Sequence, residues 1–374
     1  MELTKMLFYF SGIQGVILSL ILLLSKKHRK RANTFLAVFL LLFSMNTLRN
    51  HFSDYYFETV QSYPIIYMTT WSFYSFFGPF FYLYIKSLTG NSIHLVSTLK
   101  KHFILPLSYF AFLFYAGVRG ITTEEQVSSD SIEYYIYTLF SILVIIQLLI
   151  YLILALKIIW NYHKVLRDQF SNIDKLKLNW LFQFTSGLLI IYLLWMILMG
   201  GDILAFKKYL SDSFVNIFRT ASAIYVYWVG YYALLKPEVF TEENRPNLKT
   251  PPSNTHVDQE EIEAYKVKLI KLLEEDKLYL NSSLTLSQLA KKLKTNSKTA
   301  SQVINIGFQK TFYDLINSYR IEEVKRNLLD PNFRNYTLEA IAFNSGFKSS
   351  TTFNRLFKAH TNQTPNQYRN THLK

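Results

Sequence analysis

The sequence contains no cysteine among its 374 residues. This absence excludes disulfide bonds, thiolate metal sites and cysteine nucleophiles, and it removes the usual indicator of redox compartment. Three catalytic patterns are also missing: the H-E-x-x-H pair of zinc proteases, the glycine-rich phosphate-binding loop, and the G-x-S-x-G turn that presents a nucleophilic serine. The eight histidines do not cluster at metal-ligand spacing. We therefore expect no enzymatic activity, no catalytic residue, no bound metal and no cofactor.

Acidic residues are few relative to basic ones. There are 26 Asp and Glu against 40 Lys and Arg, a formal net charge of +14, yet half of the residues are hydrophobic and 17% are aromatic. Such an aromatic content is unusual for a soluble globule, and such a basic balance is unusual for a membrane protein. A chain whose parts lie in two different solvents accounts for both features, and its length allows two or three domains.

Apolar stretches of membrane-spanning length occupy most of the first 235 residues. A spanning helix needs about 20 mainly apolar residues, because the hydrocarbon core is about 30 Å thick. The stretches are continuous rather than alternating, which favours helices over a β-barrel. A basic cluster follows the first stretch instead of preceding it, so we expect a retained helix and not a cleaved signal peptide. The stretches, about seven in all, are roughly 6–25, 33–51, 63–86, 103–119, 133–157, 178–200 and 213–235.

The charges of the loops between these stretches predict their orientation. Cytoplasmic loops of membrane proteins carry an excess of Lys and Arg. The loops after the first, third and fifth stretches hold Lys26, Lys27, Arg29, Lys30, Arg31, Lys100, Lys101, Lys164, Arg167, Lys175 and Lys177. The alternate loops are richer in Asp and Glu. We therefore expect a multi-pass protein of the cytoplasmic (inner) membrane, with the N-terminus outside and the C-terminal domain in the cytoplasm.

Small and helix-breaking residues predict local features of this bundle. Ser11, Gly15 and Ser19 recur every four residues, a spacing that lets two helices approach closely. The Gly78-Pro79 pair and Pro106 predict bends in the third and fourth stretches. Arg219 lies inside the last stretch, where a charge either faces a cavity or partner or extends to the membrane interface. The sequence leaves both positions of Arg219 open.

The composition changes abruptly after residue 235. Residues 236–258 include Pro237, Pro246, Pro251 and Pro252 among polar residues, which predicts an exposed, flexible connector. We therefore expect three parts: a sensor-like transmembrane domain at 1–235, a linker at 236–258 and a soluble domain at 259–374.

The soluble domain contains two helix–turn–helix patterns. In the first, Thr285 and Gln288 form a predicted capping box at the start of one helix, and Ser297–Ile306 forms a second helix. In the second, a helix capped by Thr337 reaches a turn at Gly346, a position suited to positive φ. The helix at about Ser350–His360 follows. Such a unit places its second helix in the DNA major groove.

One long helix is predicted over Phe312–Leu329, between the two patterns. At about 1.5 Å per residue it is roughly 27 Å long. It could hold the two units near successive major-groove turns, which are roughly 34 Å apart. The predicted fold class is therefore all-α: a polytopic membrane helix bundle of about seven transmembrane helices, followed by an all-α tandem helix-turn-helix domain.

The end of the chain resembles a known family. Three stretches are similar, with matching spacing, to the signature of AraC/XylS-type transcription regulators: Gly346-Phe347, Phe353-Asn354-Arg355-Leu356-Phe357-Lys358, and Thr364-Pro365-Asn366-Gln367-Tyr368-Arg369. Arg320-Ile321-Glu322-Glu323-Val324 also resembles that family's linker helix. The resemblance covers roughly residues 260–370. It implies two helix-turn-helix subdomains, joined by a helix, that each insert a recognition helix into the major groove.

The resemblance also implies which residues contact DNA. These are Ser297, Lys298, Ser301 and Gln302 in the first unit, and Lys348, Ser349, Ser350, Thr351, Asn354, Arg355 and Lys358 in the second, with Lys358 near the backbone. Two positions depart from the family pattern: Lys294 and Asn362 stand where glycine is common, and each is expected to adopt the left-handed conformation. The first recognition helix offers no arginine, so it is expected to contact mainly phosphates or DNA shape.

These features predict a membrane-embedded, sequence-specific transcription regulator that couples a membrane or extracytoplasmic signal to transcription. Two alternatives stay open: a transporter-like protein with a regulatory DNA-binding tail, and a membrane tether for chromosomal DNA. The expected partners are double-stranded DNA and the lipid bilayer. Further candidates are RNA polymerase, a small-molecule or membrane signal of unknown identity, and a second copy of the chain as a homodimer.

Overall fold

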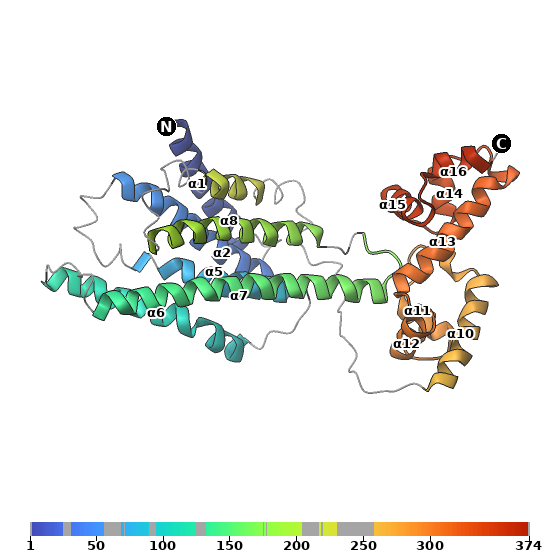
Figure 1. The fold of residues 1–374 in the computed structure, drawn as a ribbon, viewed down its shortest axis with the longest axis horizontal. Helices are drawn as coiled ribbons and strands as arrows, with labels where there is room; N and C mark the ends of the chain where they lie inside the picture. The colour runs from blue at the N-terminus through green and yellow to red at the C-terminus, as the bar shows by residue number, and fades with distance from the viewer. Residues whose placement is uncertain are drawn as a thin grey trace. The chain divides into compact units, whose positions relative to one another are not determined.

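The computed structural model describes residues 2–24, 31–55, 69–70, 72–89, 95–123, 132–174, 176, 178–203, 217, 220–229 and 258–372. Over these residues the regular structure is helical (Figure 1), and the β-type pairing is an isolated antiparallel bridge between Phe170 and Thr285. The prediction of an all-α chain is confirmed for this part of the sequence.

The chain divides into two compact units, and the division does not follow the order of the sequence. The first unit comprises residues 1–160 and 179–247, and the second comprises residues 161–178 and 248–374. The hydropathy pattern predicted that residues 161–178 belong to the membrane domain. In the structure, this segment belongs to the same unit as the C-terminal domain.

The first unit contains most of the long apolar helices. They are α1 (Glu2–Leu24), α2 (Arg31–Tyr55), the 3₁₀ helix η1 (Ser72–Phe76), α5 (Phe77–Leu88), α6 (Leu95–Thr123), α7 (Ile132–Gln169) and α8 (Asn179–Ile203). The last nine residues of α7 belong to the second unit.

Small residues allow α1 and α2 to pack closely. Ser11 and Ser19 are fully buried, and the Ser19 hydroxyl donates to the Ala37 carbonyl at 2.7 Å. A Cβ on Gly15 would lie 1.9 Å from the Ser44 hydroxyl oxygen, so a larger residue has no room there. The predicted close-packing face of the first helix is confirmed.

Aromatic rings form the centre of this unit. Phe39 of α2 contacts Phe77 and Phe81 of α5 and Phe184 of α8, with ring centroids 5.3 to 6.4 Å apart. Aromatic pairs in this range stabilise by about 0.5–1.5 kcal/mol in addition to the contribution of the surface area that they bury. The three helices are therefore joined through one aromatic cluster.

Two helices of the described residues are long and apolar enough to cross a membrane, at Lys100–Arg119 and Ile132–Gln169. Shorter apolar helices lie at Tyr9–Leu24, Ala32–Leu48 and Asn179–Leu194. The predicted bend at Gly78-Pro79 lies in the first turn of α5, directly after η1. The described part of the third stretch is therefore split between two short helices.

Several predictions fall partly or wholly on undescribed residues. Of the last apolar stretch, residues 220–229 are helical, and Arg219 lies outside the described residues. The predicted linker at 236–258 also lies outside them, except for Asp258, which precedes the first helix of the C-terminal domain.

The second unit consists of short helices around a central long one. They are α10 (Gln259–Glu274), η4 (Leu278–Leu280), α11 (Leu286–Lys292), α12 (Ser297–Gly307), α13 (Phe312–Leu329), η5 (Pro331–Phe333), α14 (Leu338–Asn344), α15 (Ser350–Thr361) and α16 (Pro365–His372). The observed α13 has the predicted bounds, and α12 and α15 each extend one residue beyond the predicted end.

Turn residues of this unit adopt the conformations expected from the sequence. Gly346 has φ +91°, and Lys294 and Asn362 have φ of 55° and 56°. The two non-glycine residues therefore occupy the left-handed region, as predicted. Gly346 is also sterically required, because a Cβ there would lie 2.5 Å from the Tyr279 carbonyl oxygen and 2.9 Å from Nε of Arg320.

We predict that Gly346→Ala destabilises the second unit by at least about 2 kcal/mol, since it combines a left-handed backbone with a Cβ clash. Gly307→Ala is the matched control. Its Cβ would meet the flexible Lys266 side chain at 3.2 Å and Ile262 at an ordinary van der Waals distance of 3.7 Å, and alanine favours a helix by about 1 kcal/mol. Hydrogen exchange of peptides from residues 258–372 in the full chain measures both changes. Equal protection in the two variants would contradict the steric requirement.

Candidate nucleic-acid interface

The first helix-turn-helix unit is built from α11 and α12. The Thr285 hydroxyl accepts from the Gln288 backbone N–H, and the side-chain Oε1 of Gln288 accepts from the Thr285 backbone N–H at 3.0 Å, which completes the predicted capping box. Asn296 caps α12 by accepting from the Thr299 N–H at 2.9 Å. The predicted inward residues Ala300, Val303 and Ile304 are all fully buried.

The second unit repeats this arrangement with α14 and α15. Thr337 caps α14 by accepting from the Ala340 N–H at 3.1 Å, and Ser349 caps α15 by accepting from the Thr352 N–H at 3.3 Å. The Phe353 ring of α15 contacts the rings of Phe347 and Phe357, with centroids 5.6 and 5.7 Å apart in tilted and edge-on arrangements. Each second helix therefore has a fixed start and one buried apolar face.

Helix α13 joins the two units through a buried arginine. Arg320 is 1% exposed, and its guanidinium donates to the carbonyls of Tyr279 and Asn281, at 2.8 Å each, and to the Asn317 side-chain oxygen at 3.2 Å. Its Cζ lies 6.0 Å from the ring centroid of Phe347, which belongs to the second helix-turn-helix unit. Burial lowers the pKa of Arg320 to about 10, so the group stays charged at neutral pH.

A second polar cluster on α13 fixes the same junction. The Glu323 carboxylate accepts from the Tyr279 hydroxyl at 2.9 Å, from Lys277 Nζ at 3.2 Å, and from Arg326. Burial raises the pKa of Glu323, but the hydrogen bonds from Tyr279, Arg326 and Lys277 outweigh it, so the pKa lies below its ordinary value. Charge-assisted hydrogen bonds therefore connect the residues just before the first helix-turn-helix unit to α13.

The predicted DNA-contacting residues of the first unit lie on α12. Ser297, Lys298, Ser301 and Gln302 are each half-buried. Ser301 accepts a hydrogen bond from Asn305 at 3.3 Å. Ser297 and Lys298 form the first turn of α12, which is the end that such a unit directs at base edges.

The predicted residues of the second unit lie on or just before α15. Thr351, Asn354, Arg355 and Lys358 are exposed and follow the spacing of one helix face. Lys348 is exposed as well, and its Nζ contacts the hydroxyl of Ser283, just before the first helix-turn-helix unit, at 2.5 Å.

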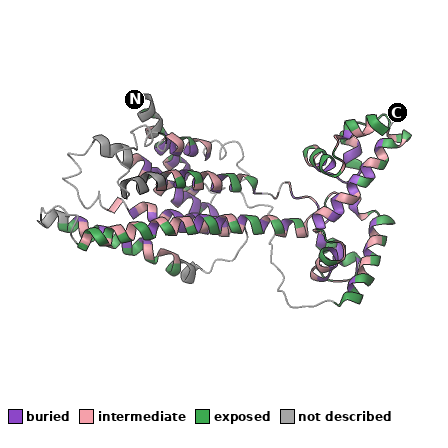
Figure 2. Ribbon diagram, in the orientation of Figure 1, coloured by how far each residue is buried: buried purple, intermediate pink, exposed green. Residues whose placement is uncertain are grey.

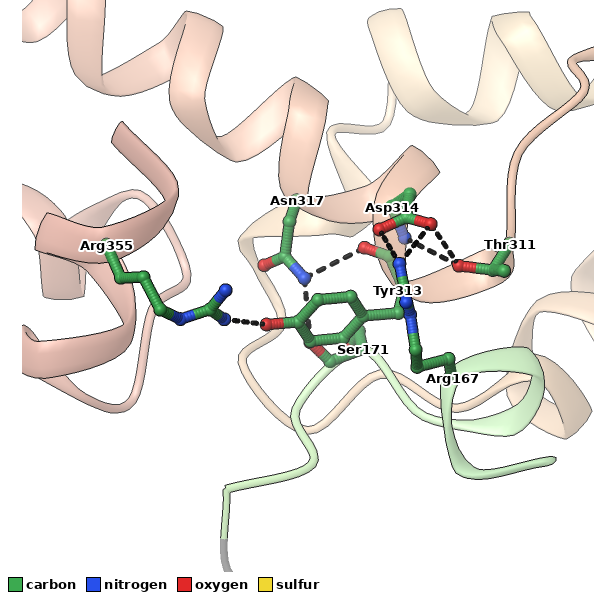
Figure 3. Close-up of polar contacts among 7 residues, drawn as sticks. All are labelled: Arg167, Ser171, Thr311, Tyr313, Asp314, Asn317 and Arg355. Carbon is green, nitrogen blue, oxygen red and sulfur yellow. Dashed lines mark hydrogen bonds and ion pairs between the residues drawn. The ribbon is translucent and has the colours of Figure 1, made fainter. Parts of the chain in front are cut away.

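Two of these residues, Ser349 and Arg355, have further contacts. Ser349 and Ser350 are half-buried, and Ser349 serves as the helix cap. The Arg355 guanidinium donates to the Tyr313 hydroxyl at 3.2 Å (Figure 3). Tyr313 belongs to α13, so Arg355 is linked to the connecting helix.

Sequence reasoning missed the contacts of residues 161–178 with this domain. We call these residues the docking segment. Ser171 contacts Leu284 and Arg320, and Asp174 contacts Thr352 of α15. Neither Ser171 nor Asp174 belongs to a periodic pattern. Arg320 did carry a signal, because it follows Ile316 and precedes Val324 at four-residue spacing on the buried face of α13.

Comparison with known proteins agrees with this geometry. Residues 289–371 match the family described as helix-turn-helix domain. The chain is 35% identical over 96 residues to an uncharacterized HTH-type transcriptional regulator of Staphylococcus aureus strain MSSA476, and 34% identical over 92 residues to one of strain COL. Each match covers 25% of this chain and only 12% of the relative. No solved structure matches the chain. The C-terminal part is therefore a helix-turn-helix domain of the kind found in transcriptional regulators.

We predict that acid destabilises the junction through Glu323. Because its pKa is lowered in the folded state, its stabilising contribution is present above the ordinary value of 4.5 and is lost as the pH falls through the lowered value. Glu323→Gln should lower stability at pH 7 by about 1.5–3 kcal/mol and flatten the loss of stability below pH 4.5. Denaturant unfolding of the full chain in detergent, followed by hydrogen exchange at Tyr279, measures both effects.

The control is Glu322→Gln, which changes an exposed carboxylate on the same helix whose ion pair, within the described part of the chain, is with Lys325. This substitution should change the free energy of unfolding by less than about 0.5 kcal/mol, both at neutral pH and in acid. If the free energy of unfolding falls equally steeply with decreasing pH in Glu323→Gln and Glu322→Gln, the role proposed for Glu323 is contradicted.

Proposed function

We propose that this chain is a membrane-embedded, sequence-specific DNA-binding transcription regulator that acts as a one-component sensor. The observation that carries the proposal is the pair of helix-turn-helix units held on one helix, α13, each with a second helix that has one buried apolar face and one polar face. The matches of residues 289–371 to a helix-turn-helix domain support the DNA-binding half of this proposal.

Rows of exposed apolar side chains support the membrane half. On α7, Leu139, Ile146, Ile150 and Ile153 are about half exposed and lie three to seven residues apart, on one face of the helix. Figure 2 shows exposed positions recurring along this long helix. On α1, an equivalent row comprises Phe10, Ile13, Ile17, Ile21 and Leu24. Water would penalise these surfaces at about 25 cal/mol per Å² of apolar area, whereas lipid would not. Contiguous apolar surfaces of this kind are typical of membrane contact.

The length of α7 explains how one helix serves two solvents. Its 38 residues span about 57 Å, nearly twice the roughly 30 Å of the hydrocarbon core. Its last nine residues, Asn161–Gln169, include Lys164, Arg167 and Asp168 and suit the aqueous side. The predicted topology places this end in the cytoplasm, and its contacts with the C-terminal domain support that side. The bundle of about seven spans is part of the proposal.

The signal that the membrane domain detects must favour one of two states of the protein. RNA polymerase and a second copy of the chain stay predictions as partners. A transporter with a regulatory tail and a chromosomal tether remain the competing functions, and they differ in measurable ways.

The experiment that tests the proposal maps genomic DNA crosslinked to the full chain in intact cells. A sequence-specific regulator gives discrete peaks that share a motif. Uniform coverage would instead indicate a tether, and an absence of crosslinked DNA would refute the proposal. Protease added to sealed, right-side-out cells should leave residues 258–372 intact; cleavage there would contradict the cytoplasmic location.

Base readout by α15 makes a separate prediction. Arg355→Ala should weaken binding to the mapped site by about 1–3 kcal/mol and relax the preference at one base pair. The base-pair preference is the decisive measurement, because Arg355 also contacts Tyr313 and overall affinity alone is ambiguous. Lys358→Ala should weaken binding to all sequences alike and reduce the salt dependence by about one phosphate contact. A sequence-selective loss for Lys358→Ala, or an unchanged preference for Arg355→Ala, would show that these roles are wrong.

A further inference from the structure

The docking segment is attached to the first helix-turn-helix unit by its backbone. The Ser171 N–H and the Ser171 hydroxyl both donate to the Leu284 carbonyl, at 3.2 and 2.7 Å. The neighbouring Phe170 forms the antiparallel bridge with Thr285, the cap of α11. The segment therefore contacts this unit at the start of α11.

The segment is also a structural part of the α13 junction. Arg320 donates to the Ser171 carbonyl and to the Ser171 hydroxyl, both at 3.1 Å, and Asn317 donates to the same carbonyl at 3.2 Å. Arg320 would lose two of its five hydrogen bonds if the segment left. A buried charged donor without an acceptor is strongly unfavourable. The docked arrangement is therefore the stable one in the absence of a competing ligand.

The segment reaches the second recognition helix as well. The Thr352 hydroxyl, in the first turn of α15, donates to the Asp174 carboxylate at 2.5 Å. Arg167 pairs with Asp314 through both carboxylate oxygens at 2.8 Å, and its guanidinium lies 5.9 Å from the Tyr313 ring centroid. Tyr313 in turn accepts from Arg355 (Figure 3). The segment thus contacts α15 through Asp174 directly and through Tyr313 indirectly.

These contacts compete with DNA. The first turn of a recognition helix approaches bases and phosphates, and there the Asp174 carboxylate places a fixed negative charge that repels phosphates. The Arg355 guanidinium is directed at Tyr313 instead of at a base. We propose that the docking segment is an intramolecular clamp that keeps the second recognition helix from DNA, and that displacement of α7 releases it. This inference rests on the proposed DNA-binding function and adds its regulation.

The clamp can be tested by locking it covalently in the full chain. Because the chain has no cysteine, the pair Asp174→Cys and Thr352→Cys can be bridged selectively with a short bismaleimide that contains a reducible bond. The probe is duplex DNA selected from a random-sequence pool by the unbridged double variant in detergent. Bridging should weaken binding by at least about tenfold, and reduction of the bridge should restore it. Unchanged or tighter binding in the bridged protein would overturn the clamp.

A pair of single substitutions tests the same idea without a crosslink. Asp174→Ala removes both a negative charge and the contact with Thr352, whereas Asp276→Ala removes only a negative charge from an exposed position of the same unit. Asp174→Ala should raise the affinity of the full chain for the selected duplex about 5- to 20-fold, and Asp276→Ala should raise it about twofold or less. Equal effects would mean that charge alone acts and that no clamp exists.

The outcomes separate this inference from the proposed function. If neither the unbridged double variant nor the wild-type chain binds any duplex, the proposed function fails and the clamp fails with it. If both bind and the bridge changes nothing, only the clamp fails.

Discussion

The buried guanidinium of Arg320 is the interaction on which the arrangement of the C-terminal unit depends. Its N–H groups donate to carbonyls at Tyr279 and Asn281, before the first helix-turn-helix unit, and to Ser171 of the docking segment. Gly346, at the turn of the second unit, has room only because it lacks a Cβ beside Arg320 Nε. All of these acceptors are uncharged. A buried charge held by dipoles alone is stable only while each acceptor stays in position, so one side chain couples three segments that are distant in sequence.

This junction determines what the two reading units can do together. Because α13 is one unbroken helix of 18 residues and Glu323 ties its middle to Tyr279, the two recognition helices have a fixed spacing. A fixed spacing turns the second binding event into an intramolecular one, which raises affinity without any new contact. It also restricts binding to DNA sites whose half-sites have the matching separation. Under the proposed function, the polar, arginine-free surface of α12 would contribute affinity, and α15 would contribute most of the base discrimination.

The sequence predicted the elements of this domain better than their partners. Helix α13 could be predicted to the residue, because helical periodicity is a local signal, whereas the left-handed conformation at Asn362 could be expected only because the family that the sequence resembles has glycine there. The docking of Ser171 on Arg320 could not be predicted, since the two residues are 149 positions apart and a lone serine carries no pattern. In the first compact unit, hydropathy indicated the apolar stretches. Hydropathy carries no information on where helix geometry changes, as happens between the 3₁₀ helix η1 and the α-helix α5.

The route by which a membrane signal could reach the reading units follows from stiffness. The composition of residues 236–258 predicts a chain with a root-mean-square span of about 26 Å and no fixed direction, and such a chain averages out a displacement of an ångström or two. A helix does not. Since α7 continues without a break from Trp160 into the docking segment, a shift or rotation of α7 would act directly on Ser171. In the structure the Ser171–Arg320 contact is formed; under the proposed clamp, loss of this contact would convert a small movement of α7 into a change of state.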